Sequence, residues 1–157
     1  MDTIALFGGS FDPPHIGHKA IVKALEKLEY IDKTIIVPAF LNPFKSESFL
    51  SANERLSLVK DMFSDFKNIE ISNFEIKKQK QVPSIETVNH FLKIYKKVYL
   101  VIGADNLSSL QKWKNYNELQ NLVTFIVAKR NGITIPKEYI TLNIDENISS
   151  TQIRKQN

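Results

Sequence analysis

The fold is decided by the opening of the chain, TIALFGGSFDPPHIGH at residues 3–18. Its first five residues, Thr3–Phe7, are mostly apolar and predict a short buried strand, and the glycine pair that follows predicts a tight turn. The turn delivers His15 and His18 to the start of a helix, where free N–H groups and a partial positive charge favour phosphate. Two imidazoles placed there suit an anion that gains charge during phosphoryl or nucleotidyl transfer.

The rest of the chain alternates between strand and helix patterns. After the opening strand, further strands are expected at 33–38, at 69–76 either unbroken or with a break near Asn73, and at 98–102, 123–128 and 139–144. Helices are expected at 16–28, 51–63 and 83–95, as one or two short helices within 107–122, and after a capping box at Ser149. Near-continuous apolar strands joined by helices predict a Rossmann-like, doubly wound parallel sheet of the α/β class, in a single domain over residues 1–157.

Such a sheet binds its ligands beyond the carboxyl ends of its strands. Four features follow predicted strands: the glycine turn, the loop after Pro38, the Gly103-Ala104-Asp105 step and the capping box Ser149-Ser150-Thr151-Gln152. We therefore expect these four segments to meet at one rim of the sheet.

Composition limits the alternatives. The chain has 157 residues, no cysteine and a formal net charge of +4. A disulfide framework and a thiolate nucleophile are therefore excluded, and no apolar run approaches the roughly 20 residues of a membrane span. The mild positive charge suits nucleotides, whereas the densest lysine cluster, 77–80, has no interleaved aromatics and predicts no nucleic-acid site. A cytoplasmic protein without membrane or nucleic-acid partners is expected.

The candidate site residues have ordinary alternatives. His15 and His18 could be capping residues, but a metal pair is disfavoured because no further ligand lies at suitable spacing. The Ser149–Arg154 segment either does no more than cap a helix or binds a polyphosphate through its hydroxyls and guanidinium. Lys45 is either a solvated loop lysine or a charge carried onto the substrate. Trp113, between two lysines, either packs at a helix end or stacks on an aromatic ring.

Two motifs carry a family resemblance. Residues 9–18, GSFDPPHIGH, and residues 148–154, ISSTQIR, resemble the HxGH and ISSTxIR signatures of the nucleotidyltransferase superfamily. The doubled glycine, the stretch 102–106 and Trp113 narrow the resemblance to the bacterial nicotinate-nucleotide adenylyltransferases. It covers essentially the whole chain and implies the nucleotidyltransferase type of fold. It also implies a reaction in which ATP and nicotinate mononucleotide give deamido-NAD and pyrophosphate, with Mg²⁺ bound through the ATP phosphates.

The resemblance implies roles for individual residues. His18, His15, Lys45 and Arg154 would be catalytic, with His18 on the α-phosphate. ATP would be bound by Gly9, Ser10, Phe11, His15, His18, Gly103, Asp105, Ser149, Ser150, Thr151 and Arg154. The mononucleotide would be bound by Ser10, Lys45, Thr87 and Trp113, with Trp113 stacked on the ring. No protein metal site is implied, and a homo-oligomer is compatible with the family.

The chain departs from the family pattern at three places. The segment before the loop lysine is Asn42-Pro43-Phe44, the segment near the nicotinate ring is residues 83–87, and a further C-terminal helix of the family is expected to be missing. Two other functions therefore stay open. One is a pantetheine-phosphate adenylyltransferase, against which the glycine pair and Trp113 argue, and the other is a non-catalytic nucleotide-binding module.

Overall fold

A six-stranded parallel sheet forms the centre of the structure, a computed structural model that describes residues 2–40 and 49–144. The strands are β1 (Thr3–Gly9), β2 (Lys33–Pro38), β3 (Ile69–Ile71), β4 (Lys97–Gly103), β5 (Val123–Ala128) and β6 (Ile140–Leu142). Their order is β3-β2-β1-β4-β5-β6, and every neighbouring pair is parallel. The predicted doubly wound α/β fold is confirmed.

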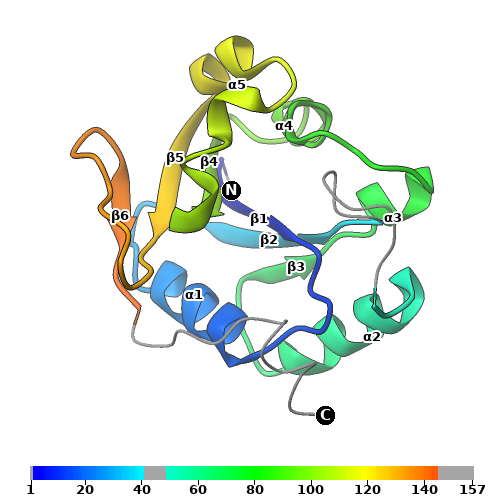
Figure 1. Ribbon diagram of the computed structural model, residues 1–157. Helices are drawn as coiled ribbons and strands as arrows, with labels where there is room; N and C mark the ends of the chain where they lie inside the picture. The colour runs from blue at the N-terminus through cyan, green and yellow to red at the C-terminus, as the bar shows by residue number, and fades with distance from the viewer. Residues whose placement is uncertain (1, 41–48, 145–157) are drawn as a thin grey trace.

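Helices cover both faces of this sheet (Figure 1). They are α1 (Ile16–Glu26), α2 (Ala52–Met62), α3 (Phe74–Lys78), α4 (Ser84–Leu92) and α5 (Tyr116–Leu122), with 3₁₀ turns η1 (Ala104–Asn106) and η2 (Leu110–Lys112). Helices α1 and α2 lie on one face, and α4 and α5 lie on the other. Crossovers between parallel strands are right-handed. The connecting helices therefore move to the other face of the sheet where the winding direction reverses.

Each face of the sheet has its own hydrophobic core, because side chains alternate along a strand. In β1, Ile4 and Leu6 pack in the core under α4 and α5, whereas Ala5 and Phe7 pack in the core under α1 and α2. All four side chains are buried. The near-continuous apolar pattern of the strand is thus the pattern of a strand covered on both sides.

The local sequence signals place most elements correctly. The strand at 123–128 has the predicted bounds, and Ser51 and Glu54 form the predicted capping box at the start of α2. The helix predicted to begin near Pro83 is α4. The capping box predicted at Ser149 lies outside the described residues.

The strand predicted at 69–76 breaks near Asn73, as the alternative had it, and the strand expected beyond this break is wrong. Strand β3 ends at Ile71, and the chain turns into α3. The Ser72 hydroxyl accepts a hydrogen bond from the Phe74 N–H, a local bond that competes with continued strand pairing. The Phe74 ring then stacks on His90 of α4, with ring centroids 4.1 Å apart. This contact with a distant helix outweighs the strand propensity of the isoleucines.

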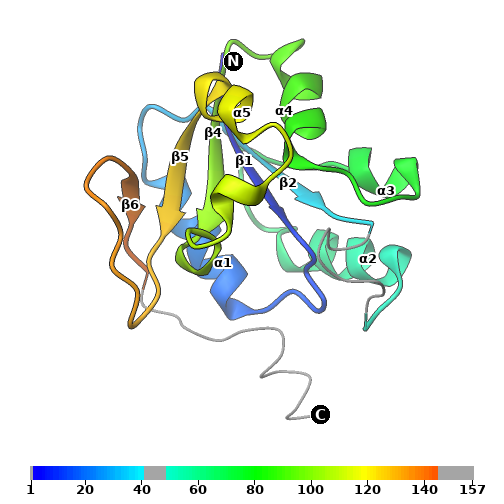
Figure 2. The same ribbon diagram turned by 45° about the horizontal axis from the view of Figure 1, so that its top comes forward.

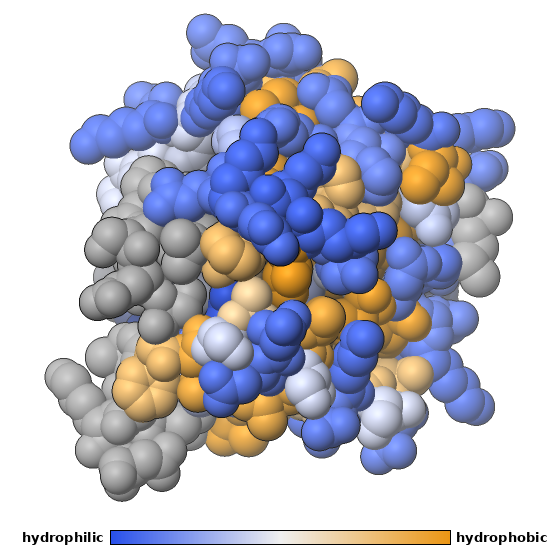
Figure 3. Space-filling view, turned by 90° about the vertical axis from the view of Figure 1, so that its right-hand side faces the viewer, coloured by the Kyte–Doolittle hydropathy of each residue, from blue (hydrophilic) through white to orange (hydrophobic). Residues whose placement is uncertain are grey.

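The surface mixes polar and apolar residues. Figure 3 shows the side of the molecule at α2 and α3, where apolar residues form a band between hydrophilic ones. The large apolar side chains that are exposed in the described residues come from several elements: Ile16, Tyr30, Phe49, Leu58 and Ile94. In the ranges 2–40 and 49–144, no helix has the length and apolar composition that a bilayer crossing requires.

Candidate functional site

A cavity of about 600 Å³ lies at the carboxyl ends of β1 and β4. These two strands are neighbours in the sheet, and the winding of the chain reverses between them. Figure 2 shows the arrowheads of β1, β4 and β5 at the same edge of the sheet. The cavity therefore occupies the topological switch point, the expected ligand position in a doubly wound fold, and its volume fits a nucleotide-sized ligand.

The structure brings most of the predicted site residues that it describes to this cavity. Its lining includes Gly9, Ser10, His15, His18, Gly103, Asp105 and Trp113. Phe11 and Thr87 do not line the cavity, but Phe11 contacts the ring of His18 and Thr87 donates a hydrogen bond to Glu75, both of which do. The other predicted site residues, Lys45, Ser149, Ser150, Thr151 and Arg154, lie outside the described residues.

The histidine wall of the cavity consists of Gly9, Ser10, His15, Gly17 and His18. His15 is the N-cap of α1, and its Nδ1 accepts a hydrogen bond from the Gly17 N–H at 3.0 Å. The Nδ1 atom of His18 accepts from the His15 N–H, also at 3.0 Å. The two rings are stacked with centroids 3.9 Å apart. The capping alternative therefore holds for this pair, and both residues also line the cavity, whereas the predicted contact with phosphate stays a prediction.

These bonds define the chemical state of both imidazoles. A ring nitrogen that accepts a backbone N–H carries no proton, so in the neutral form the proton is on Nε2. Burial, and to a smaller extent the positive charge of Arg130, lower the pKa of His15 to about 4. Burial and the neighbouring His15 lower the pKa of His18 to about 3. Near neutral pH the wall presents two neutral Nε2–H donors, not two cations.

Phe11 supports this wall from below. Its ring is buried, and its centroid lies 4.6 Å from that of His18 and 5.4 Å from that of Phe7. Its backbone has φ of 51°, a left-handed conformation that a phenylalanine rarely adopts. The aromatic contacts hold the turn in this conformation, and they fix the plane of the His18 ring.

A buried arginine that the sequence did not single out clamps the same turn. The Arg55 side chain of α2 has 0% exposure. Its Nη1 donates to the carbonyls of Ser10 and Ala39 at 2.6 Å each, and its other nitrogens donate to the carbonyls of Phe40 and Leu50. Arg55 therefore joins the glycine turn to the end of β2 and to the start of α2.

Asp12 makes the complementary contacts. Its carboxylate accepts hydrogen bonds from the Phe49 N–H at 2.6 Å and from the Leu50 N–H at 2.7 Å. Phe40 and Phe49 are the described residues that flank 41–48, the stretch that carries Lys45. Both are thus bound to the glycine turn, by Arg55 and by Asp12. The sequence gives no signal that Arg55 is buried, because this burial depends on the tertiary fold and not on the apolar spacing of its helix.

The glutamate wall consists of Glu75, Val82, Pro83 and Ser84. Glu75 is only 8% exposed, and its carboxylate accepts a hydrogen bond from the Thr87 hydroxyl at 2.6 Å. Burial raises the pKa of Glu75 to about 7, although the Thr87 bond acts in the opposite direction. Thr87 itself is buried and does not line the cavity, so the predicted mononucleotide residue contacts the cavity through Glu75.

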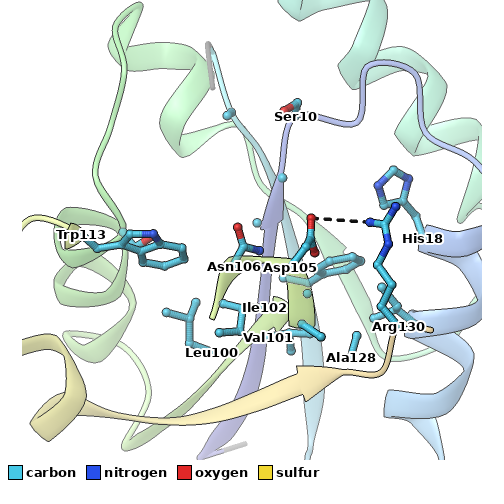
Figure 4. Close-up of a pocket in the computed structure, with 18 of the residues that line it drawn as sticks. Ser10, His18, Leu100, Val101, Ile102, Asp105, Asn106, Trp113, Ala128 and Arg130 are labelled. Atoms are coloured by element: carbon cyan, nitrogen blue, oxygen red, sulfur yellow. Dashed lines mark ion pairs between the residues drawn. The ribbon is translucent and has the colours of Figure 1, made fainter. Parts of the chain in front are cut away.

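Trp113 lies across the cavity from His18 (Figure 4). The indole is half-buried and packs against the core under α4 and α5, which the flanking lysines did not suggest. Its Nε1–H is buried and has no hydrogen-bond partner within the described part of the chain. Most buried donors are satisfied, so this indole is a feature that the chain packing alone does not explain.

Asp105 and Arg130 form an ion pair at the mouth of the cavity, with Nη1 and Oδ2 3.5 Å apart. An added Cβ at Gly103 would lie 2.6 Å from Oδ1 of Asp105, so glycine leaves room for this carboxylate. Arg130 was missed by the sequence analysis. Its signal was available, because Lys129 and Arg130 directly follow the strand at 123–128 and the carboxyl end of that strand was not considered.

Comparison with known proteins identifies the family of this site. The cytidylyltransferase-like family matches residues 6–156. A relative from Sulfurimonas denitrificans, named "Probable nicotinate-nucleotide adenylyltransferase", is 57% identical over 155 residues, 99% of this chain and 85% of the relative. A relative of the same name from Campylobacter fetus is 49% identical over 98% of this chain and 86% of its own length.

A solved structure supports the fold independently. It is the nicotinic acid mononucleotide adenylyltransferase of Plasmodium falciparum complexed with NaAD, which is 21% identical. The match has a TM-score of 0.82 and covers 99% of this chain and 83% of that chain. With a family match over nearly all of its residues, this chain belongs to the cytidylyltransferase-like nucleotidyltransferases and, within them, to the nicotinate-nucleotide adenylyltransferase family.

Proposed function

We propose that this protein transfers the adenylyl group of ATP to nicotinate mononucleotide, forming deamido-NAD and pyrophosphate. The observation that carries the proposal is the pair of imidazoles with fixed Nε2–H groups at the switch point of the sheet. Relatives up to 57% identical bear the name of this activity. The location that suits this reaction is the cytoplasm, where its nucleotide substrates are made.

The reaction needs positioning and charge stabilisation more than a covalent intermediate. An oxygen of the mononucleotide phosphate attacks the α-phosphorus of ATP in line, and pyrophosphate leaves. The Nε2–H of His18 donates to an α-phosphate oxygen on which charge grows, and His15 holds the neighbouring phosphates. Because both donors are already oriented by backbone bonds, little reorganisation is needed in the transition state.

The second substrate binds at the other end of the cavity. The proposed position of the nicotinate ring is against Trp113, beside the glutamate wall. Asp105 is expected to hold the ribose of ATP. Mg²⁺ enters as the ATP complex, since Mg²⁺ is usually held by substrate phosphates and few protein groups. Lys45, Ser149, Ser150, Thr151 and Arg154 stay predictions for phosphate binding.

A comparison of acceptors tests the proposal. The purified protein is incubated with ATP, Mg²⁺ and nicotinate mononucleotide, nicotinamide mononucleotide or phosphopantetheine, and pyrophosphate and the adenylated product are measured. We expect the highest kcat/KM with nicotinate mononucleotide. A higher kcat/KM with phosphopantetheine would favour the pantetheine-phosphate adenylyltransferase alternative. ATP binding without pyrophosphate release from any acceptor would favour a non-catalytic module.

A further inference from the structure

A buried carboxyl group lines the cavity on the side where the ring of the mononucleotide is proposed to lie. Two carboxyl groups line the described part of the cavity, those of Glu75 and Asp105. Asp105 is paired with Arg130 at the mouth, whereas Glu75 is only 8% exposed. Trp113 lies across the cavity from His18 (Figure 4). A ring stacked on the indole is therefore bordered by the glutamate wall, in which Glu75 is the single ionisable side chain.

One oxygen of the Glu75 carboxyl group already has a partner. Its Oε2 accepts the hydrogen bond from the Thr87 hydroxyl at 2.6 Å, and Thr87 is itself buried. A neutral carboxyl group carries one O–H donor. Since Oε2 is occupied as an acceptor, the proton of the neutral acid belongs on Oε1. The Thr87 bond thus fixes the orientation of the acid and defines the donor that it can offer to a ligand.

The surroundings of Glu75 favour this neutral acid. Burial, opposed by the Thr87 bond and assisted by the Glu86 carboxylate, raises its pKa to about 7. None of the ion pairs within the described residues involves Glu75, and Lys80 is paired with Glu86. The neighbouring end of β2, Ile36 to Pro38, has no ionisable side chain. The other titratable groups on the elements around Glu75 are Lys77 and Lys78 of α3, His90 of α4, and Lys112 and Lys114 beside Trp113.

We propose that Glu75 is a specificity-determining residue that binds the ring carboxylate of the acceptor as a carboxylic acid, with its Oε1–H donating to a carboxylate oxygen. The inference rests on the proposed function. A bond of this kind, from O–H to a charged oxygen, is stronger than one between neutral groups. An ionised Glu75 would repel the ring carboxylate, but it would accept a hydrogen bond from the amide of a nicotinamide ring. The charge state of Glu75 therefore sets the preference between acid and amide.

The test compares two acceptors that differ in this ring substituent alone. With ATP and Mg²⁺, kcat/KM is measured for nicotinate mononucleotide and for nicotinamide mononucleotide between pH 6 and pH 8.5. The ratio of the two values cancels the titration of groups that both reactions share. Since the pKa of Glu75 is about 7, its neutral fraction falls about thirtyfold over this range, and the acid-to-amide ratio of the wild type should fall by a similar factor. A ratio constant within about twofold would overturn the inference.

Three variants separate this role from a structural one. Glu75→Gln carries an N–H donor at every pH, so its ratio should stay constant within about twofold. Thr87→Val removes the hydroxyl that stabilises the ionised carboxylate, so the fall in the ratio should move to higher pH. Glu29→Gln, at an exposed carboxylate after α1, is the control and should keep the wild-type profile. A purely structural Glu75 would leave the pH dependence of the ratio unchanged in Glu75→Gln and in Thr87→Val, and that result would overturn the inference.

The acceptor preference of the wild type is established first, at pH 6.5, with both mononucleotides and phosphopantetheine. A preference for phosphopantetheine, or the absence of any adenylated product, would overturn the proposed function and the inference with it. A preference for nicotinate mononucleotide that does not vary with pH would overturn the inference alone.

Discussion

The histidine wall and the glutamate wall of the cavity both hold buried titratable groups, but different contacts assemble them. In the histidine wall, each Nδ1 accepts from a backbone N–H two or three residues away. In the glutamate wall, Glu75 is held by the hydroxyl of Thr87, twelve residues further along the chain and on another helix. One wall is therefore ordered by local sequence and the other by the packing of α3 against α4.

The histidine wall and the glutamate wall also differ in the charge states of their titratable groups. Protonation of either histidine would break a backbone hydrogen bond, so the neutral state is built into the turn. Glu75 instead has a pKa of about 7, so both of its charge states are populated near neutral pH. The histidine wall thus presents one fixed set of donors, whereas the chemical state of the glutamate wall varies with its surroundings. The predictions below test how far this contrast holds.

The largest effect is expected at Arg55, which clamps the histidine wall to the sheet. Arg55→Met keeps the aliphatic volume but leaves four carbonyls without their donor, so we expect a loss of about 3–5 kcal/mol in unfolding free energy. Urea unfolding measures it. Arg130→Met is the matched control, since it removes a half-exposed arginine and should cost under about 1 kcal/mol. Equal losses in the two variants would show that Arg55 is no clamp.

Two substitutions of His18 separate its roles as acceptor and donor. His18→Asn can place Oδ1 near the Nδ1 position and keep the bond from the His15 N–H, but its amide does not reach the Nε2 position. His18→Gln reaches toward the Nε2 position and loses the cap. We expect kcat to fall about a hundredfold or more in His18→Asn and less in His18→Gln. The unfolding free energy should fall in the reverse order, by about 1 kcal/mol in His18→Gln.

The test depends on the two variants, His18→Asn and His18→Gln, ranking in opposite order in kcat and in unfolding free energy. Steady-state kinetics and urea unfolding are measured on the same preparations. If activity and stability fall in parallel, His18 acts only as a capping residue, and the donor role assigned to its Nε2–H is wrong.

The contrast between the walls also explains what the sequence could predict. The strands, the helix starts and the position of the histidine pair depend on patterns within a few residues, and the structure bears out this placement. The part of the predicted strand beyond the break near Asn73 failed because the stacking of Phe74 on His90 comes from a distant helix. Glu75 was missed for the same reason, since its burial exists only once α3 has packed on α4.

Arg55 and Arg130 illustrate two different limits. The burial of Arg55 depends on three segments that meet only in the fold, so no local pattern announces it. Arg130 follows β5 directly, and the rule that ligands bind beyond strand ends would have selected it. Lys45 and the residues from Ser149 to Arg154 lie outside the described residues, and their part in the site stays a prediction.

The pH dependence of stability should differ between the walls. The lowered pKa values of His15 and His18 mean that the unfolded chain binds more protons below pH 6.5, so this contribution is present above pH 6.5 and is lost toward pH 3–4. The raised pKa of Glu75 has the opposite effect, because it makes the unfolding free energy fall as pH rises. Its contribution is present below pH 4.5 and is lost as pH rises through about 7.

Glu75→Gln isolates the second contribution. The amide cannot ionise, so we expect the variant to exceed the wild type in unfolding free energy by about 1–2 kcal/mol at pH 8 and to match it near pH 5. Urea unfolding at the two pH values measures the difference. Glu29→Gln, a change of the same kind at an exposed carboxylate after α1, is the control and should alter the unfolding free energy little at either pH. A constant difference at both pH values would mean that Glu75 is ionised throughout.

The smallest effect is expected at Trp113, where the glutamate wall meets the predicted ring position. Trp113→Phe keeps an aromatic face and removes the buried Nε1–H that has no partner in the described residues, so stability should change by less than about 1 kcal/mol. If the indole contacts the mononucleotide, KM for that substrate should rise a few-fold in Trp113→Phe and more in Trp113→Ala, with KM for ATP little changed. A rise confined to ATP would place the adenine at Trp113 and reverse the assignment of the two ends of the cavity.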